Sequence, residues 1–288
     1  MSTTLPRTVL AYQTNAKLYT LSTLVQAVTP FPQLAEASQQ VFKTASPTDQ
    51  DSVVVTQETI FHPQGGGQPS DVGVITSPSS GARFTVSAVR HDALNDGVVL
   101  HLGRFADVST TTAAAATTKP LFTPGDTVTQ AIDVDKRTLY SRLHTAGHVL
   151  GAAVRHLLEH EIPGFDELKA SHFPDSAACE FQGLIEGKWK EGIQNKVTEY
   201  VERAMPVQIE FWDEDDFRRE GLERLIPRGG DTNVDVARGE KFRVVRIVGA
   251  EVYPCGGTHV DTTDLCGKVG VRKISRQKGT SRVSYNVS

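Results

Sequence analysis

The stretch DKRTLYSRLHTAGHVLGAAVRHLLEHE, Asp135 to Glu161, separates two parts of the sequence that have different patterns. Its apolar residues recur at three- and four-residue spacing, which predicts one long helix of about six turns. They are Leu139, Leu143, Ala146, Leu150, Ala153 and Leu157. Because short strand-like runs precede this helix and mixed patterns follow it, the sequence predicts a domain boundary near residue 133.

The part before the helix is typical of β-structure. Short runs rich in β-branched residues, bounded by turn residues, lie at 52–61, 72–77, 83–89, 97–102 and 126–134. This spacing predicts a small antiparallel barrel or a sandwich, and the pattern does not choose between them. Two polar or low-complexity stretches, 30–52 and 108–120, are predicted to be surface loops.

The part after the helix mixes both patterns. A second amphipathic helix is predicted over 187–204, and strands are predicted at 206–212, 241–249 and 281–287. Helices that alternate with such strands predict an α+β domain, with helices against an antiparallel sheet. We therefore expect a β-rich domain at 1–133, which carries a glycine-rich loop, and an α+β domain at 134–288.

Composition narrows the class of protein. The 288 residues are 39% hydrophobic and 22% charged, as in ordinary soluble domains. No long apolar run predicts a membrane span, and the first residues lack the pattern of a secretory signal. Three cysteines are too few for a disulfide framework, so a reducing, cytoplasmic location is expected. The net charge of −4 argues against a general nucleic-acid binder.

Basic residues gather near the end of the chain, where no acidic residue accompanies them. They are Lys268, Arg272, Lys273, Arg276, Lys278 and Arg282. Such a cluster on an acidic protein indicates a contact with phosphate or another anion. It is equally typical of a solvated strand pair whose lysines protect a sheet edge, and both interpretations stay open.

Two pairs of residues at four-residue spacing predict a metal site. His144 and His148 lie on one face of the predicted helix, and Cys255 and His259 flank the glycines of CGGTH, which indicate a loop. Three imidazoles and a thiolate form a tetrahedral set suited to zinc. Histidine spacing alone is weak support, because His156 and His160 repeat it further along the helix, where a surface position is expected.

Neighbouring residues limit the alternatives for this site. Cys266 could replace one ligand, whereas Cys179 lies in an apolar run and is expected to be a core thiol. No glutamate stands between the two helix histidines. The zinc-protease motif H-E-x-x-H, which needs that glutamate as its general base, is therefore absent.

The stretch FHPQGGGQPSDVG, Phe61 to Gly73, forms a second motif. It lacks the lysine and serine of a phosphate-binding loop and the helix of a dinucleotide fingerprint. Three consecutive glycines allow a backbone to approach another group closely. The loop is predicted either to be a wide hairpin with a bulge, or to press against a polynucleotide backbone or the metal domain.

The order G-G-G-Q-P-x-D, H-x3-H and C-G-G-T-H-V resembles the free-standing alanyl-tRNA editing proteins, the AlaX family, and the editing region of alanyl-tRNA synthetase. The resemblance covers the chain from about Val53 onward. It implies a small β-barrel followed by an α+β editing domain. It also implies ATP-independent hydrolysis, in trans, of alanine-accepting tRNA wrongly charged with serine or glycine.

The resemblance also implies roles for individual residues. The zinc ligands would be His144, His148, Cys255 and His259. Thr145 and Thr258 are candidate catalytic donors to the serine hydroxyl. Candidate tRNA contacts are Gly65, Gly66, Gly67 and Gln68, together with the six basic residues from Lys268 to Arg282. Gln68 is expected near either the tRNA acceptor stem or the zinc pocket.

Two departures from the family pattern affect recognition of serine. The residue before the second helix histidine is often threonine in the family and is Gly147 here, and a frequent glutamine is replaced by Leu168. Two other functions stay open. One is editing of another mischarged tRNA, such as Ser-tRNA(Thr), and the other is a non-catalytic RNA-binding module with structural zinc.

Overall fold

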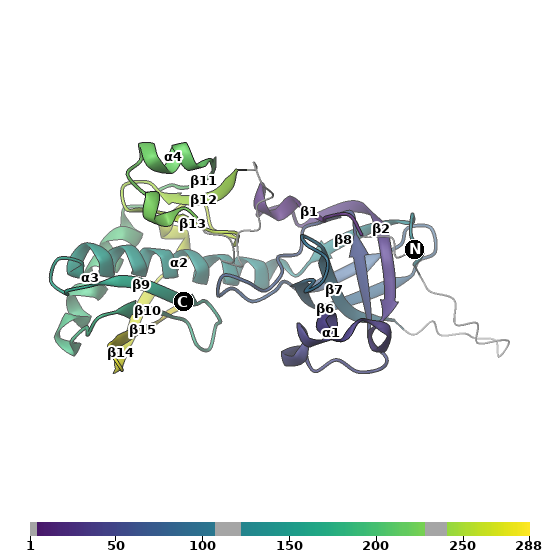
Figure 1. The fold of residues 1–288 in the computed structure, drawn as a ribbon, viewed down its shortest axis with the longest axis horizontal. Helices are drawn as coiled ribbons and strands as arrows, with labels where there is room; N and C mark the ends of the chain where they lie inside the picture. The colour runs from purple at the N-terminus through teal and green to yellow at the C-terminus, as the bar shows by residue number, and fades with distance from the viewer. Residues whose placement is uncertain (1–4, 107–121, 228–240) are drawn as a thin grey trace. The chain divides into compact units, whose positions relative to one another are not determined.

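The computed structural model describes residues 5–106, 122–227 and 241–288. The chain forms two compact units. Met1–Gln64 and Ser70–Arg137 make up the first, and Gly65–Pro69 and Thr138–Ser288 make up the second. The predicted α+β class is confirmed, because a closed antiparallel barrel and further antiparallel sheets accompany the helices (Figure 1). The predicted loop at 108–120 lies outside the described residues.

The first unit is a closed barrel with the strand order β2-β3-β7-β6-β5-β8, in which every pair is antiparallel. Its strands are β2 (Thr20–Pro30), β3 (Ser52–Thr56), β5 (Gly73–Thr76), β6 (Arg83–His91), β7 (Val99–Phe105) and β8 (Thr127–Ile132). The sequence left a barrel and a sandwich open, and the structure shows the barrel. A short parallel pair, β1 (Val9–Leu10) with β4 (Glu58–Thr59), lies in the same unit.

The segment 30–52 differs from the surface loop that we predicted. It contains the helix α1 (Glu36–Gln40) and short turns of 3-10 helix at Phe31–Gln33 and Lys43–Ala45. Phe42 is completely buried, and its ring packs edge-on against Phe31 at 6.4 Å. The polar composition of the segment concealed these two aromatic anchors, which attach it to the barrel core.

The aspartate of the glycine motif has a structural partner in the first unit. Asp71 forms a buried ion pair with Arg137, whose Nε lies 3.1 Å from both carboxylate oxygens. Asp71 also accepts a hydrogen bond from the His62 amide, and Arg137 donates to the carbonyl of Ala16. Both side chains are about 1% exposed, so the loss of one partner would leave an uncompensated buried charge.

The second unit packs helices against antiparallel strands. Its helices are α2 (Val134–Leu158, assigned to this unit from Thr138), α3 (Lys190–Glu202) and α4 (Glu214–Arg219). One sheet has the order β14-β15-β10-β9, and the other has the order β11-β12-β13. Their strands are β9 (Asp166–Ser171), β10 (Ala178–Gln182), β11 (Val207–Trp212), β12 (Phe242–Ile247), β13 (Glu251–Pro254), β14 (Val269–Gln277) and β15 (Thr280–Val287).

The core of the second unit explains the composition of α2. Apolar residues on several faces of this helix are almost completely buried against α3 and the four-stranded sheet. The long helix therefore lies inside the unit and fixes the side chains that point from it. Within the described residues, no helix combines the length and apolar character that a membrane crossing requires.

Candidate metal centre

Helix α2 presents two histidines toward one point. His144 and His148 are one turn apart, and their ring centroids lie 5.0 Å from each other. Their exposed fractions are only 1% and 9%. Because the helix itself is packed in the core, the two imidazoles have little freedom to move apart.

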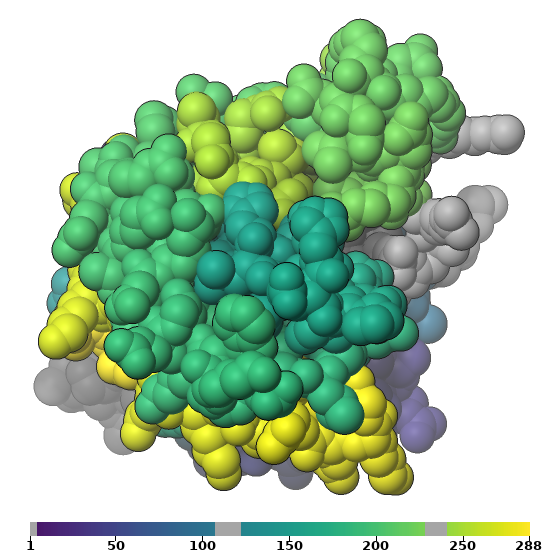
Figure 2. All heavy atoms as spheres, turned by 90° about the vertical axis from the view of Figure 1, so that its left-hand side faces the viewer, coloured from purple at the N-terminus to yellow at the C-terminus, as the bar shows by residue number. Residues whose placement is uncertain are grey.

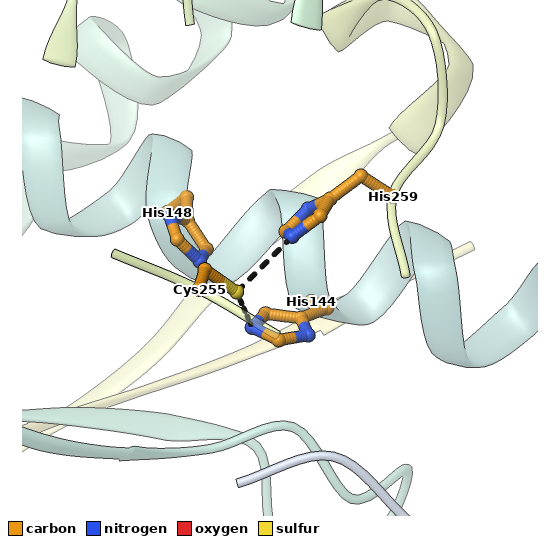
Figure 3. Close-up of side chains that lie close together, drawn as sticks. All are labelled: His144, His148, Cys255 and His259. Carbon is orange, nitrogen blue, oxygen red and sulfur yellow. Dashed lines mark hydrogen bonds between the residues drawn. The ribbon is translucent and has the colours of Figure 1, made fainter. Parts of the chain in front are cut away.

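The loop after β13 brings Cys255 and His259 to the same point. Gly257 allows this approach, because a Cβ there would lie 2.8 Å from Gln68 Oε1 and would overlap the His144 ring. The Cys255 sulfur lies 3.4 Å from Nε2 of His144 and 3.4 Å from Nε2 of His259. Figure 3 shows the four side chains converging from the helix and the loop.

The four residues form a group that could hold a metal ion. One donor atom from each of His144, His148, Cys255 and His259 lies within 4.8 Å of the other three. Tetrahedral zinc needs ligand atoms roughly 3.5 Å apart, given bonds of about 2.0–2.3 Å. His148 Nδ1 is buried and has no hydrogen-bond partner among the described residues, a state that is costly for an unbound imidazole.

The glycine motif holds one of these histidines. Gln68 Oε1 lies 2.7 Å from His144 Nδ1, so Nδ1–H donates to it and Nε2 is left facing Cys255. The same oxygen accepts the Thr258 amide at 3.0 Å, while the Gln68 side-chain nitrogen donates to Thr258 Oγ1 at 2.8 Å. Gln68 is fully buried. Gln68 therefore contacts His144 of the metal group, although it is not among the residues that line the pocket.

The three glycines before Gln68 belong to the second unit together with it. Gly67 has a φ of +77° and accepts the His172 amide at 2.8 Å. A Cβ on Gly67 would lie 3.0 Å from the carbonyl carbon of Ala170, so this close approach requires glycine. Gly66 is exposed and lines the pocket, and Gly65 closes the turn with a hydrogen bond from the Gln68 amide.

Thr145 holds a second histidine of the group. Its Oγ1 lies 3.1 Å from His259 Nδ1 and also accepts the Val260 amide at 3.2 Å. Thr145 and Thr258 are both fully buried, and neither lines the pocket. The structure therefore places both predicted threonines behind the metal group, in contact with the residues that orient it.

A pocket of about 460 Å³ opens beside the group. The lining residues include His144, His148, Cys255, His172, Tyr253, Glu167, Arg155 and Leu168. Tyr253 packs edge-on against His148 at 4.6 Å and donates a hydrogen bond to Glu167 at 3.1 Å. Arg155 pairs with the same carboxylate at 3.1 Å. Tyr253 therefore links His148 of the candidate metal group to the charged pair of Glu167 and Arg155.

Gly147 and Gly151 leave part of α2 bare on the pocket side. A Cβ on Gly147 would lie 2.5 Å from His172 Nδ1 and 2.7 Å from the Tyr285 hydroxyl. A Cβ on Gly151 would lie 2.9 Å from a carboxylate oxygen of Glu167. The departure at Gly147 thus has a steric reason, since another ring occupies the space of a side chain.

Burial sets the charge state of the site. Burial and, to a smaller extent, the nearby charge of Arg243 together lower the pKa of His148 to about 3. Burial likewise lowers the pKa of His172 to about 3, so both rings are neutral at physiological pH. Burial raises the pKa of the Cys255 thiol, whereas the Arg243 charge opposes that rise and favours the thiolate.

Sequence reasoning missed several residues that shape the site. His172, Tyr253 and Arg243 were not among the candidates, and neither were the paired Arg155 and Glu167. His172 lies in the stretch KASHF, Lys169 to Phe173, and nothing in its spacing connects it to His144. Arg243 lies inside an apolar strand pattern, and a buried charge there was a usable signal.

The other histidines and cysteines lie outside the group. Cys179 is buried in the core and bonds the Gly147 carbonyl, and Cys266 is buried in the same core. His156 contacts the Tyr200 hydroxyl at 2.6 Å. The His160 side chain is 92% exposed.

The basic cluster forms a hairpin on the surface. Strands β14 and β15 carry most of it, and their yellow atoms reach the lower edge of the face in Figure 2. Lys268, Arg272, Lys273, Arg276 and Lys278 are exposed. Arg282 is partly buried, donates to the Ser176 carbonyl and lies 3.8 Å from Glu180.

Comparisons with known proteins agree with this arrangement. Residues 242–284 match the second additional domain of threonyl and alanyl tRNA synthetases. The chain is 31% identical over 247 residues to an alanine–tRNA ligase of Methanosphaera stadtmanae, covering 82% of this chain and 24% of the ligase. It is 30% identical over 237 residues to the ligase of Methanothrix thermoacetophila, covering 81% and 23%.

A shorter relative is similar over still more of the chain. The alanyl-tRNA editing protein AlaX-L of Pyrococcus horikoshii is 29% identical over 255 residues, which cover 88% of this chain and 55% of AlaX-L. The chain thus spans about a quarter of the ligases and about half of AlaX-L. The chain is therefore similar to alanine–tRNA ligases and to an alanyl-tRNA editing protein, and its residues 242–284 match a domain named for threonyl and alanyl tRNA synthetases.

Proposed function

We propose that this chain hydrolyses the ester of alanine-accepting tRNA mischarged with serine, and secondarily with glycine, as a zinc-dependent deacylase acting in trans in the cytoplasm. One observation carries the proposal. Three imidazoles and a thiol converge beside an open pocket, in a chain similar to alanine–tRNA ligases and to an alanyl-tRNA editing protein.

The donor set supports zinc as the ion. Nitrogen and sulfur donors in a tetrahedral arrangement are typical of it. Bound by His144, His148, Cys255 and His259, zinc would supply a Lewis acid that polarises an ester carbonyl. Two side chains would orient these ligands. Gln68 holds the His144 ring by a hydrogen bond, and Thr145 holds the His259 ring.

An aminoacyl ester is already reactive, so positioning contributes much of the required acceleration. The pocket volume of about 460 Å³ is within the usual range for small-molecule sites. We propose Thr145 and Thr258 as positioning residues, because their burial supports this role better than the direct substrate contact suggested by sequence.

Binding of tRNA would rely on the basic hairpin. Lys268, Arg272, Lys273, Arg276 and Lys278 are exposed and can reach phosphates, whereas Arg282 is already engaged. Gly66, exposed at the pocket, can approach the acceptor end. Gly65, Gly67 and Gln68 do not line the pocket, and we propose that they support it, since Gly67 accepts the amide of the lining residue His172.

The test is an ester-loss assay with the full chain loaded with zinc. We expect rapid loss of serine from seryl-tRNA(Ala), slower loss of glycine, and retention of alanine on alanyl-tRNA(Ala). A chelator should abolish the activity, and added zinc should restore it. Intact seryl-tRNA(Ala) after incubation with the zinc-loaded protein would refute the proposal.

Because the matched domain is named for threonyl as well as alanyl tRNA synthetases, hydrolysis of Ser-tRNA(Thr) is a second candidate function. Exchanging the tRNA in the same assay separates the two substrates. A non-catalytic RNA-binding module with structural zinc predicts that His148→Ala unfolds the second unit. The deacylase predicts that His148→Ala loses activity while circular dichroism still reports folded protein.

A further inference from the structure

The pocket is lined by one further histidine in addition to His144 and His148 of the metal group. His172 follows β9 and is only 2% exposed, and its ring stacks on His144 at 4.2 Å with an interplanar angle of 23°. Its backbone is held by the hydrogen bond to Gly67, and its ring lines the pocket. His172 therefore reaches the same space as the metal ligands without belonging to their set.

Hydrogen bonds fix the tautomer of this ring. The Tyr285 hydroxyl donates its single hydrogen to the Leu143 carbonyl at 2.9 Å. It must therefore accept from His172 Nδ1–H, which lies 2.7 Å away. The neutral ring then carries its lone pair on Nε2, and no described residue donates a hydrogen bond to that atom. An almost completely buried side chain thus presents a free acceptor.

Three other polar side chains near the candidate ligands are already engaged. The Tyr253 hydroxyl donates to Glu167, and Thr145 and Thr258 lie behind the ligands. Gly147 has no side chain, and its bare position is what makes room for the His172 ring. Leu168, which also lines the pocket, is apolar. His172 Nε2 is therefore an uncharged acceptor open to a substrate, alongside the carboxylates of Asp166, Glu167 and Glu180 that also line the pocket.

We propose that His172 Nε2 accepts a hydrogen bond from the side-chain hydroxyl of a seryl ester, and so determines the preference for serine. The inference rests on the deacylase function proposed above. A ring that only accepts is matched to a hydroxyl that donates. An alanyl or glycyl ester leaves the buried acceptor without a partner, which is costly.

The first test measures binding without hydrolysis. Seryl, alanyl and glycyl groups are attached by an amide to 3′-amino-3′-deoxyadenosine, and their dissociation constants are measured by calorimetry with wild type and His172→Phe. Phenylalanine keeps the ring and its stacking but removes Nε2. We expect wild type to prefer the seryl amide by about tenfold over the alanyl amide, and the variant to show no preference.

Two further variants separate substrate recognition from structure. Tyr285→Phe frees the tautomer and should reduce the serine preference in part. His156→Phe alters a similar histidine–tyrosine pair that lies outside the pocket, and should leave the preference unchanged. The zinc content and melting midpoint of each variant are measured in parallel.

The outcomes distinguish the two proposals. If wild type neither hydrolyses seryl-tRNA(Ala) nor binds any amide, the proposed function fails and this inference fails with it. If wild type is active but His172→Phe keeps its serine preference, only the inference fails. Equal weakening of all three amides by His172→Phe would also overturn it, because His172 would then serve a group that all three share.

Discussion

At the scale of single residues, one methyl group is enough to disturb the metal centre. Gly257 lies against the His144 ring, so Gly257→Ala must push the loop or the ring aside. We expect zinc affinity to fall at least tenfold in chelator competition, since ligand geometry controls affinity (~1.4 kcal/mol per factor of ten). Gly192→Ala, on α3 with no atom within 4 Å, should leave the affinity unchanged.

Unchanged zinc affinity in Gly257→Ala would mean that the loop adjusts freely, which would contradict the rigid approach described here. The same variant should retain the barrel, because Gly257 belongs to the second unit. Calorimetry of the zinc-free protein separates a metal defect from a general loss of folding.

His101 predicts how the barrel responds to acid. It is completely buried, with Nδ1 2.9 Å from the Val54 carbonyl and Nε2 2.8 Å from Thr59 Oγ1. Burial lowers its pKa from 6.5 to about 4. The imidazole takes up a proton more readily in the unfolded chain than in the folded one. The free energy of unfolding is therefore fully present above pH 6.5 and decreases as the pH falls from 6.5 through about 4. The linked loss is about 3 kcal/mol.

The measurement is the melting midpoint by calorimetry between pH 7 and pH 4. His101→Gln keeps a donor and an acceptor but does not titrate, so its midpoint should fall less steeply than that of wild type. His160→Gln, at a 92% exposed side chain, should follow wild type. If the melting midpoints of wild type and His101→Gln fell equally steeply with pH, His101 would not be the cause of the loss of stability in acid.

At the scale of elements, the loop Gly65–Pro69 supports the metal group. Gln68→Leu would leave His144 Nδ1 and the Thr258 amide without their acceptor. We expect zinc affinity to fall about 10- to 100-fold, as is usual when a partner of a ligating histidine is removed. Gln64→Leu, at an exposed neighbouring position, is the matched control. An affinity equal to that of the control would show that Gln68 does not orient the ligand.

The β14–β15 hairpin predicts the salt dependence of tRNA binding. Lys273 and Arg276 are exposed, so Lys273→Ala with Arg276→Ala should weaken binding to every tRNA sequence. It should also reduce the slope of log affinity against log salt by about two. Arg219→Ala, at an exposed arginine already paired with Asp216, should change neither quantity. If the double variant kept the wild-type slope, the result would show that Lys273 and Arg276 do not contact tRNA.

The helices and strands also show which parts of the fold could be predicted from the sequence. Periodicity located α2, α3 and most strands, because burial on one face leaves a regular pattern. It missed β1, β2, β9, β13 and β14, which are short or lack a continuous apolar run. The convergence of CGGTH on the helix histidines could be inferred from spacing and ligand chemistry. The stacking of His172 on His144 could not, since it depends on a tertiary contact made possible by Gly147.

At the scale of the whole molecule, the two units have separate cores and should respond differently to metal removal. The chain has two tryptophans, Trp189 and Trp212, and both lie in the second unit. Chelation should therefore lower the melting midpoint seen by tryptophan fluorescence, because bound zinc stabilises only the folded state. A chelator should have no further effect on His148→Ala. A midpoint unaffected by chelation of the wild type would argue against a bound ion.

The assignment of Gly65–Pro69 to the second unit has a practical consequence for protein dissection. A fragment that starts at residue 134 would contain all four candidate ligands and the whole pocket helix, yet it would lack Gln68. Such a fragment would leave a buried imidazole nitrogen and a buried amide without their acceptor. Supplying residues 61–73 as a separate peptide should then restore zinc affinity in trans, which makes the glycine motif a candidate for fragment complementation.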